Sequence, residues 1–159
     1  LGEILQERKL EFGKDVAIVI SNDAVHYGDE DWGGKNMAPF GSDSSGNQKA
    51  RQLEQEIIST CLEGSLSSGK IQKFVQYTVQ KSDYREYKWT WCGRYAVPLG
   101  LSVSNKLNQF LFQEALSGQF INYASSIDHA LFEVEDIRMG TTAPANSHHW
   151  VGYVGMGYK

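Results

Sequence analysis

The sequence has little of what marks several large protein classes. Its 159 residues hold two cysteines, Cys61 and Cys92, too few for a disulfide-stapled domain, so we expect reduced thiols in the cytoplasm. The formal net charge is -4 and the lysines and arginines are scattered, which argues against binding to nucleic acid or to an anionic membrane. No apolar run approaches the ~20 residues of a membrane-spanning helix.

Several common signals are also missing. The start of the chain lacks the basic-then-apolar order of a signal peptide, reads like the end of a helix, and has no initiator methionine. We therefore expect it to be a piece of a longer protein. The glycine-rich stretch at 31–46 lacks the Lys-Ser/Thr end of a phosphate-binding loop, and neither CxxC nor HExxH occurs.

The apolar patterns that are present favour one α/β domain. The run VAIVI at 16–20 has no polar alternation, which predicts a central strand covered on both faces. Apolar spacing predicts helices at about 3–10, 47–62, 69–81 and 96–116, and strands at 119–126 and 148–159. This order predicts an α/β fold, a three-layer α/β sandwich around a mainly parallel or mixed central sheet. The last helix is expected to bury Leu99, Val103, Leu107, Phe110 and Leu111.

Two separated stretches carry groups that suit a chemical site. Asp23 and His26 lie in SNDAVHYG, directly after the apolar run, where ligands gather in open α/β sheets. Cys92 and Arg94 lie in TWCGRYAVP, just before a predicted helix whose N-terminus would stabilise a thiolate. The structural alternatives are a capped turn for the first stretch and a buried cysteine beside two tryptophans for the second.

Other candidates are weaker. His148 and His149 are adjacent, so on a strand they would face opposite sides and could not share one ion. The aromatic residues around Cys92 could form the floor of a pocket, but such sets more often belong to the core. These are Tyr84, Tyr87, Trp89 and Trp91.

Four motifs in order resemble the C-terminal half of the Memo family, of the type called AmmeMemoRadiSam system protein B. SNDAVHYG is similar to the family's SSDxSHxG, with Asp23 and His26 kept, and WCGRYAVP is similar to ICGRxPI, with Cys92 and Arg94 kept. FINYASS and the terminal WVGYVGMGYK complete the match. Together these motifs cover nearly the whole chain, residues 1–159, but the N-terminal half of the family pattern is absent from it.

The resemblance implies a fold related to class III extradiol dioxygenases and a non-haem iron or copper site. Cys92 would be a metal ligand, and Asp23, His26 and Arg94 would be catalytic or supporting groups. A catalytic metal site needs about three protein ligands, so the missing half or another chain would complete it. Family members often lie alongside a radical-SAM protein and an AMMECR1-like protein, which makes these the implied partners.

Two other functions stay open on the residues alone. The chain could be a metal-free module that binds a peptide or a small ligand in its aromatic stretch. It could also be a hydrolase with Cys92 as nucleophile, His26 as base and Asp23 as the group that orients the base.

Overall fold

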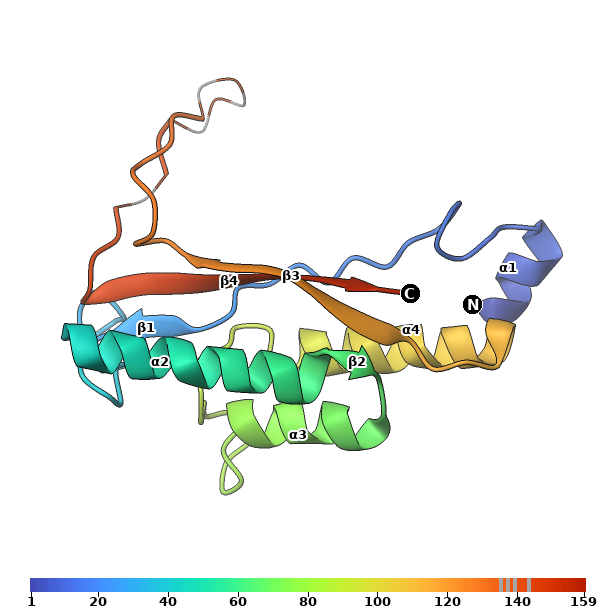
Figure 1. The fold of residues 1–159 in the computed structure, drawn as a ribbon, viewed down its shortest axis with the longest axis horizontal. Coiled ribbons are helices and arrows are strands. Elements are labelled where there is room, and N and C mark those ends of the chain that lie inside the picture. The colour runs from blue at the N-terminus through green and yellow to red at the C-terminus, as the bar shows by residue number, and fades with distance from the viewer. Residues whose placement is uncertain (135, 137, 139, 143) are drawn as a thin grey trace.

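The structure, a computed structural model, describes residues 1–134, 136, 138, 140–142 and 144–159 (Figure 1). The elements are α1 (Gly2–Arg8), β1 (His26–Gly28), α2 (Ser44–Ile57), a π-helical continuation η1 (Ile58–Leu62), β2 (Gly64–Ser65), α3 (Ser68–Thr78), α4 (Ala96–Phe112), β3 (Ser117–Ser125) and β4 (His149–Tyr158).

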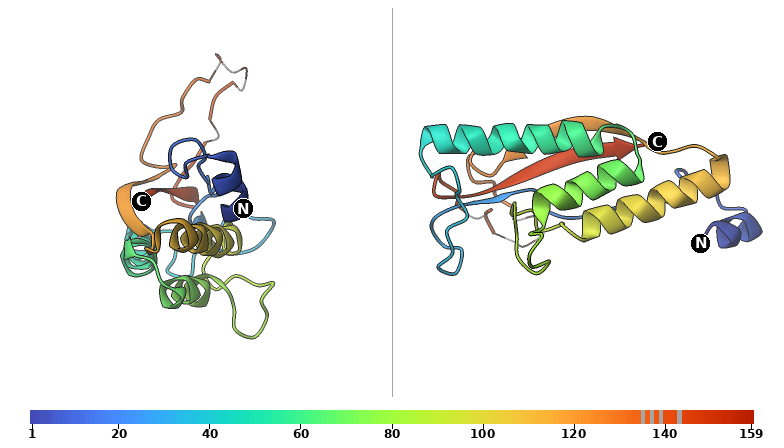
Figure 2. Two further views of the ribbon diagram at one scale, coloured as in Figure 1. Left: turned by 90° about the vertical axis from the view of Figure 1, so that its right-hand side faces the viewer. Right: turned by 90° about the horizontal axis from the view of Figure 1, so that it is seen from below.

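The sheet corrects the predicted fold class. Its four strands run in the order β1-β4-β3-β2, and every pair is antiparallel. Helices α2, α3 and α4 lie together on one side of this sheet, while the described parts of the β3–β4 connection lead away on the other (Figures 1 and 2). The prediction of a three-layer sandwich around a parallel or mixed sheet is therefore wrong.

The run at 16–20 is the main reason for this error. It is extended but belongs to no strand of the sheet, and its one bridge joins Val16 to Phe12. Val16, Ile18 and Ile20 are half-buried, whereas Val19 is 85% exposed. An apolar, β-branched run indicates an extended backbone, but only a neighbouring backbone can make it a strand.

The helices agree better with their apolar spacing. Asp43 caps α2 by accepting a hydrogen bond from the Gly46 amide at 2.7 Å, and Ser67 caps α3 by accepting from the Lys70 amide at 3.2 Å. The end of η1 at Leu62 matches the predicted end of the second helix. None of the described helices is long and apolar enough to cross a membrane.

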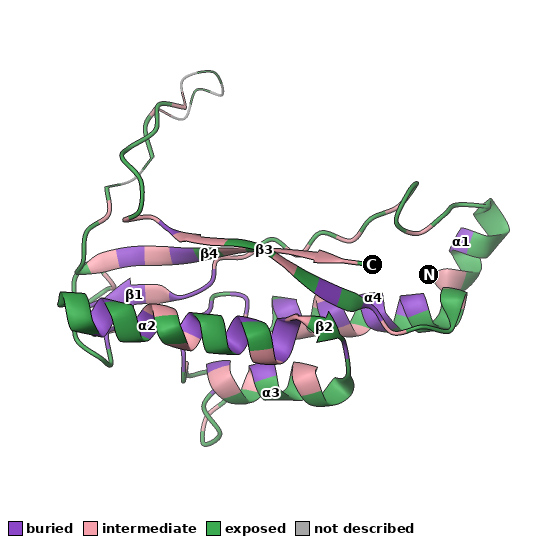
Figure 3. Ribbon diagram, in the orientation of Figure 1, coloured by how far each residue is buried: buried purple, intermediate pink, exposed green. Residues whose placement is uncertain are grey.

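Helix α4 buries a different face from the predicted one. Of the five expected positions only Leu107 is buried, whereas Leu99, Val103 and Phe110 are exposed. Buried and exposed residues follow one another along the whole of α4 (Figure 3). The helix has apolar side chains on more than one face, so spacing alone could not show which face meets the core. The buried face consists of Val97, Leu101, Ser104, Asn105, Leu107 and Asn108.

The main core lies between the sheet and helices α2, α3 and α4, and it supports both stretches that carry candidate site residues. Tyr27 of β1 and Trp150 of β4 are opposite one another in the ladder, and both are fully buried against the helices. Trp91, next to Cys92, is also buried and packs edge-on against Phe74 of α3 at 5.0 Å between ring centroids. Segments 23–26 and 89–92 are therefore anchored in the same core.

Candidate metal centre

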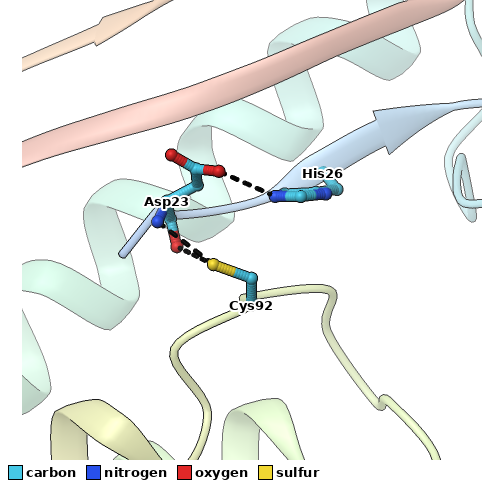
Figure 4. A group of neighbouring side chains, drawn as sticks. All are labelled: Asp23, His26 and Cys92. Carbon is cyan, nitrogen blue, oxygen red and sulfur yellow. Dashed lines mark hydrogen bonds and ion pairs between the residues drawn. The ribbon is translucent and has the colours of Figure 1, made fainter. Parts of the chain in front are cut away.

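The structure brings Asp23, His26 and Cys92 together. One ligand atom from each of these residues lies within 4.8 Å of the other two, and the three side chains are partly or fully accessible (Figure 4). The His26 Nε2 and Asp23 Oδ2 atoms are 3.3 Å apart. The backbone amide of Asp23 donates a hydrogen bond to the Cys92 sulfur at 3.1 Å. A carboxylate, an imidazole and a thiol thus converge from two segments far apart in the chain.

Backbone pairing explains how the two segments meet. Val25 and Trp91 form an antiparallel bridge, and the His26 amide donates to the Thr90 carbonyl at 3.0 Å. Gly93 permits the close approach, because a Cβ atom at this position would lie 2.3 Å from the Asn22 side-chain oxygen. The glycine beside Cys92 in CGR is therefore a packing requirement of the site.

Glu54 of α2 lies beneath both segments and is fully buried. Its Oε1 atom accepts hydrogen bonds from the indole N–H groups of Trp89 at 2.5 Å and Trp91 at 2.6 Å. Its Oε2 atom accepts from the backbone amide of Val25 at 3.2 Å. One carboxylate therefore ties the segment that carries Cys92 to the segment that carries Asp23 and His26.

Burial also changes the acidity of this carboxyl. Removal from water raises the pKa of Glu54 to about 7, against the opposing effect of the hydrogen bonds from Trp89, Trp91 and Val25. A buried carboxyl of this kind is poised between its neutral and charged forms near physiological pH. Sequence reasoning missed Glu54, although a signal was present: it falls four residues after Ala50 and three before Ile57, both on the apolar stripe of the helix.

The loop at 29–43 places a second unpredicted residue beside the centre. The Trp32 ring stacks on His149 at 4.0 Å between ring centroids and lies 5.1 Å from the His26 ring. Its indole N–H is buried without a hydrogen-bond partner among the described residues. Asp29 fastens the loop to the start of β4, because it contacts His148 Nδ1 at 2.8 Å and accepts from the Ser42 hydroxyl at 2.6 Å.

Arg94 lies among aromatic rings and a backbone carbonyl. Its guanidinium lies 3.5 Å from the centre of the Tyr87 ring and 5.0 Å from that of Tyr95, and it donates to the Arg85 carbonyl at 2.8 Å. It makes no ion pair with any described residue. These contacts fix the turn that follows Cys92.

The location of the cluster also differs from expectation. Residues 16–20 form no strand, so the cluster does not sit at the carboxyl end of a parallel sheet. Instead, His26 opens the edge strand β1, and Asp23 precedes it by three residues. Of the aromatic set near Cys92, Trp89 and Trp91 belong to the core, and Tyr84 is exposed.

Comparisons with known proteins gave no match. No protein-family model matches the chain, and no significant match was found among curated proteins or solved structures.

Proposed function

We propose that this chain contributes a three-residue centre for a transition-metal ion, with Asp23, His26 and Cys92 as ligands. The observation that carries the proposal is their convergence: an oxygen, a nitrogen and a sulfur atom all lie within 4.8 Å of one another. The described residues contain no second group of three potential metal ligands.

The distances and the donor set fit a metal ion. Metal–nitrogen and metal–oxygen bonds of about 2.1 Å and metal–sulfur bonds of about 2.3 Å separate tetrahedral ligand atoms by about 3.4–3.6 Å. The Asp23 Oδ2 to His26 Nε2 separation of 3.3 Å matches one such edge. The third atom needs only a small shift, because every pair is within 4.8 Å.

The Cys92 sulfur is accessible and accepts a hydrogen bond from the Asp23 amide at 3.1 Å. A thiolate with an imidazole and a carboxylate suits borderline first-row metals rather than calcium or magnesium. A reducing compartment such as the cytoplasm keeps this sulfur free to bind.

Iron or copper is the metal that we propose, because the sequence motifs resemble those of Memo proteins. Such an ion would supply redox or Lewis-acid chemistry, and Asp23, His26 and Cys92 would hold it. Three protein ligands leave room for a further ligand, either a small molecule or a group from the family's N-terminal half or another chain.

Titration of the protein with Fe(II), Cu(I) and Zn(II) tests the proposal. We expect one ion per chain, with affinity reduced at least about 100-fold in Cys92→Ser, because a thiolate ligand is lost. Cys61→Ala is the matched control, since it removes the other thiol, which is buried away from the cluster. Equal binding by the parent chain and Cys92→Ser would overturn the proposal.

The hydrolase alternative has support from the same cluster, since Asp23 Oδ2 lies 3.3 Å from His26 Nε2 and can orient the ring. It differs in its requirement for a free thiol. Saturation with metal would abolish a Cys92-dependent esterase activity on p-nitrophenyl acetate, whereas a metal-dependent reaction needs the ion. A hydrolytic activity that resists removal of metal and is lost in Cys92→Ser would favour the hydrolase.

A further inference from the structure

A cavity of about 650 Å³ lies against the outer face of the sheet, between β3, β4 and the described part of the segment that joins them. Its wall includes His149, Val151 and Tyr153 of β4, which alternate with the inward-facing Trp150 and Gly152. A cavity of this volume is within the usual range for small-molecule sites, about 300–1,000 Å³.

The cavity adjoins the metal centre on the same face of the sheet. Val151 is the direct ladder partner of His26, so their side chains stand side by side. Burial, and after it the charge of Asp23, raises the pKa of the Tyr153 hydroxyl on the cavity wall. Trp32 links the two, because its ring stacks on His149, which lines the cavity, and lies 5.1 Å from the ring of His26.

The lining selects a neutral ligand. Apolar side chains predominate, including Leu131 and Phe132, and no lysine, arginine, aspartate or glutamate is among the described residues that line the cavity. An ion would lose its hydration there without gaining an opposite charge. The ligand class is therefore a neutral, mainly apolar molecule.

His149 adds one directional requirement. Its Nδ1 atom is 3.0 Å from the Glu30 carbonyl oxygen, which can only accept, so Nδ1 carries the proton. In the neutral ring Nε2 is then an acceptor, and it calls for a hydrogen-bond donor on the ligand. Trp32 already stacks on one face of this imidazole, and a flat ligand ring can lie against the other.

We propose that this cavity is the substrate compartment of the centre and takes a neutral, planar, mainly apolar molecule that carries a hydrogen-bond donor. The role as a compartment rests on the proposed metal function, whereas binding to the cavity does not.

Indole is a suitable probe, since it is neutral and flat and has one N–H donor. Two related compounds serve as controls: 1-methylindole lacks the donor, and indole-3-acetate adds a negative charge.

Calorimetry on the metal-free chain tests binding. We expect saturable binding of indole, and binding about tenfold weaker for 1-methylindole and for indole-3-acetate. Ala124→Phe, which places a ring in the cavity from β3, should abolish binding. Ile121→Phe adds the same ring on the same strand at an exposed position outside the lining, and should leave binding unchanged. No saturable binding by the parent chain, or equal binding by the two phenylalanine variants, would overturn the proposal.

His149→Leu tests the acceptor. The preference for indole over 1-methylindole should disappear in this variant, and its persistence would contradict the role given to His149. Loading with Cu(II) then tests the link to the centre: indole proton resonances should broaden in the parent chain and stay sharp in Cys92→Ser. Sharp resonances in a copper-loaded parent chain would overturn the role of the cavity as a substrate compartment. Failure to load copper would count against the metal function alone.

Discussion

The backbone amide of Asp23 lies 3.1 Å from the sulfur of Cys92, although the two residues are 69 positions apart. The sulfur in turn lies 3.5 Å from the Asp23 carbonyl oxygen. This contact joins the segment before β1 to the turn before α4. The side chain of His26 lies beside Asp23 and adds a third group to the same cluster.

Cys92 should be the reactive thiol of the native chain. It is exposed, whereas burial raises the pKa of Cys61 to about 11, so Cys61 is almost entirely protonated at neutral pH. Iodoacetamide followed by mass spectrometry should label Cys92 at least about tenfold faster in the folded protein. Bound metal should protect it. Equal labelling of both cysteines under native conditions would contradict the structure.

Glu54→Gln should weaken metal binding without touching a ligand. The amide oxygen can accept from both indoles, but the amide nitrogen then faces the Val25 N–H, so the segment with Asp23 and His26 loses its anchor. We expect a decrease of about 10–100-fold in affinity, typical for groups that support metal ligands. Ile57→Val, one turn along the same helix, is the matched core control. Unchanged affinity in Glu54→Gln would show that the ligands do not depend on this carboxylate.

Stability should fall as pH rises between about 4.5 and 7 because of Glu54. Burial raises its folded-state pKa to about 7 from an ordinary value of 4.5, so in this window the unfolded chain has lost a proton that the folded chain keeps. The unfolded state binds fewer protons, and the free energy of unfolding therefore decreases with pH, by about 3 kcal/mol in total from this group. Urea titrations of the metal-free chain across this range should show the trend.

Glu54→Gln isolates that contribution, because glutamine does not titrate. The difference in unfolding free energy between the two proteins should change with pH below about 7 and level off above it. Parallel pH profiles for the two proteins would contradict the assignment of the trend to Glu54.

Helix α4 offers a test of which face meets the core. Leu101 is 2% exposed and Leu99 is 67% exposed, two positions apart. Leu101→Ala should cost about 2–5 kcal/mol of unfolding free energy, as expected for a buried leucine. Leu99→Ala should change it by about 0.5 kcal/mol or less. Thermal and chemical denaturation measure both, and similar losses would show that Leu99 is covered in solution.

The helices and the two long strands followed from the sequence. The apolar spacing after Asp43 and Ser67 placed α2 and α3 within a few residues, because capping and burial of one face act locally. The alternation in the last ten residues likewise indicated β4. Local patterns also singled out the Asp23, His26 and Cys92 residue types, and their family order suggested that they meet.

Tertiary structure alone decided the rest. Residues 16–20 have the composition of a central strand, but a strand needs a neighbouring backbone, and the sheet pairs β1 with β4 instead. The apolar residues of α4 lie on several faces, so only packing shows that Leu101 is inside and Leu99 outside. Glu54 is an acidic residue on an apolar stripe. Its structural role depends on hydrogen bonds from two tryptophans and one backbone amide, which lie 29 to 37 residues away in the chain. Such contacts depend on how the chain closes, because hydrogen bonds between distant segments leave no periodic trace in the sequence.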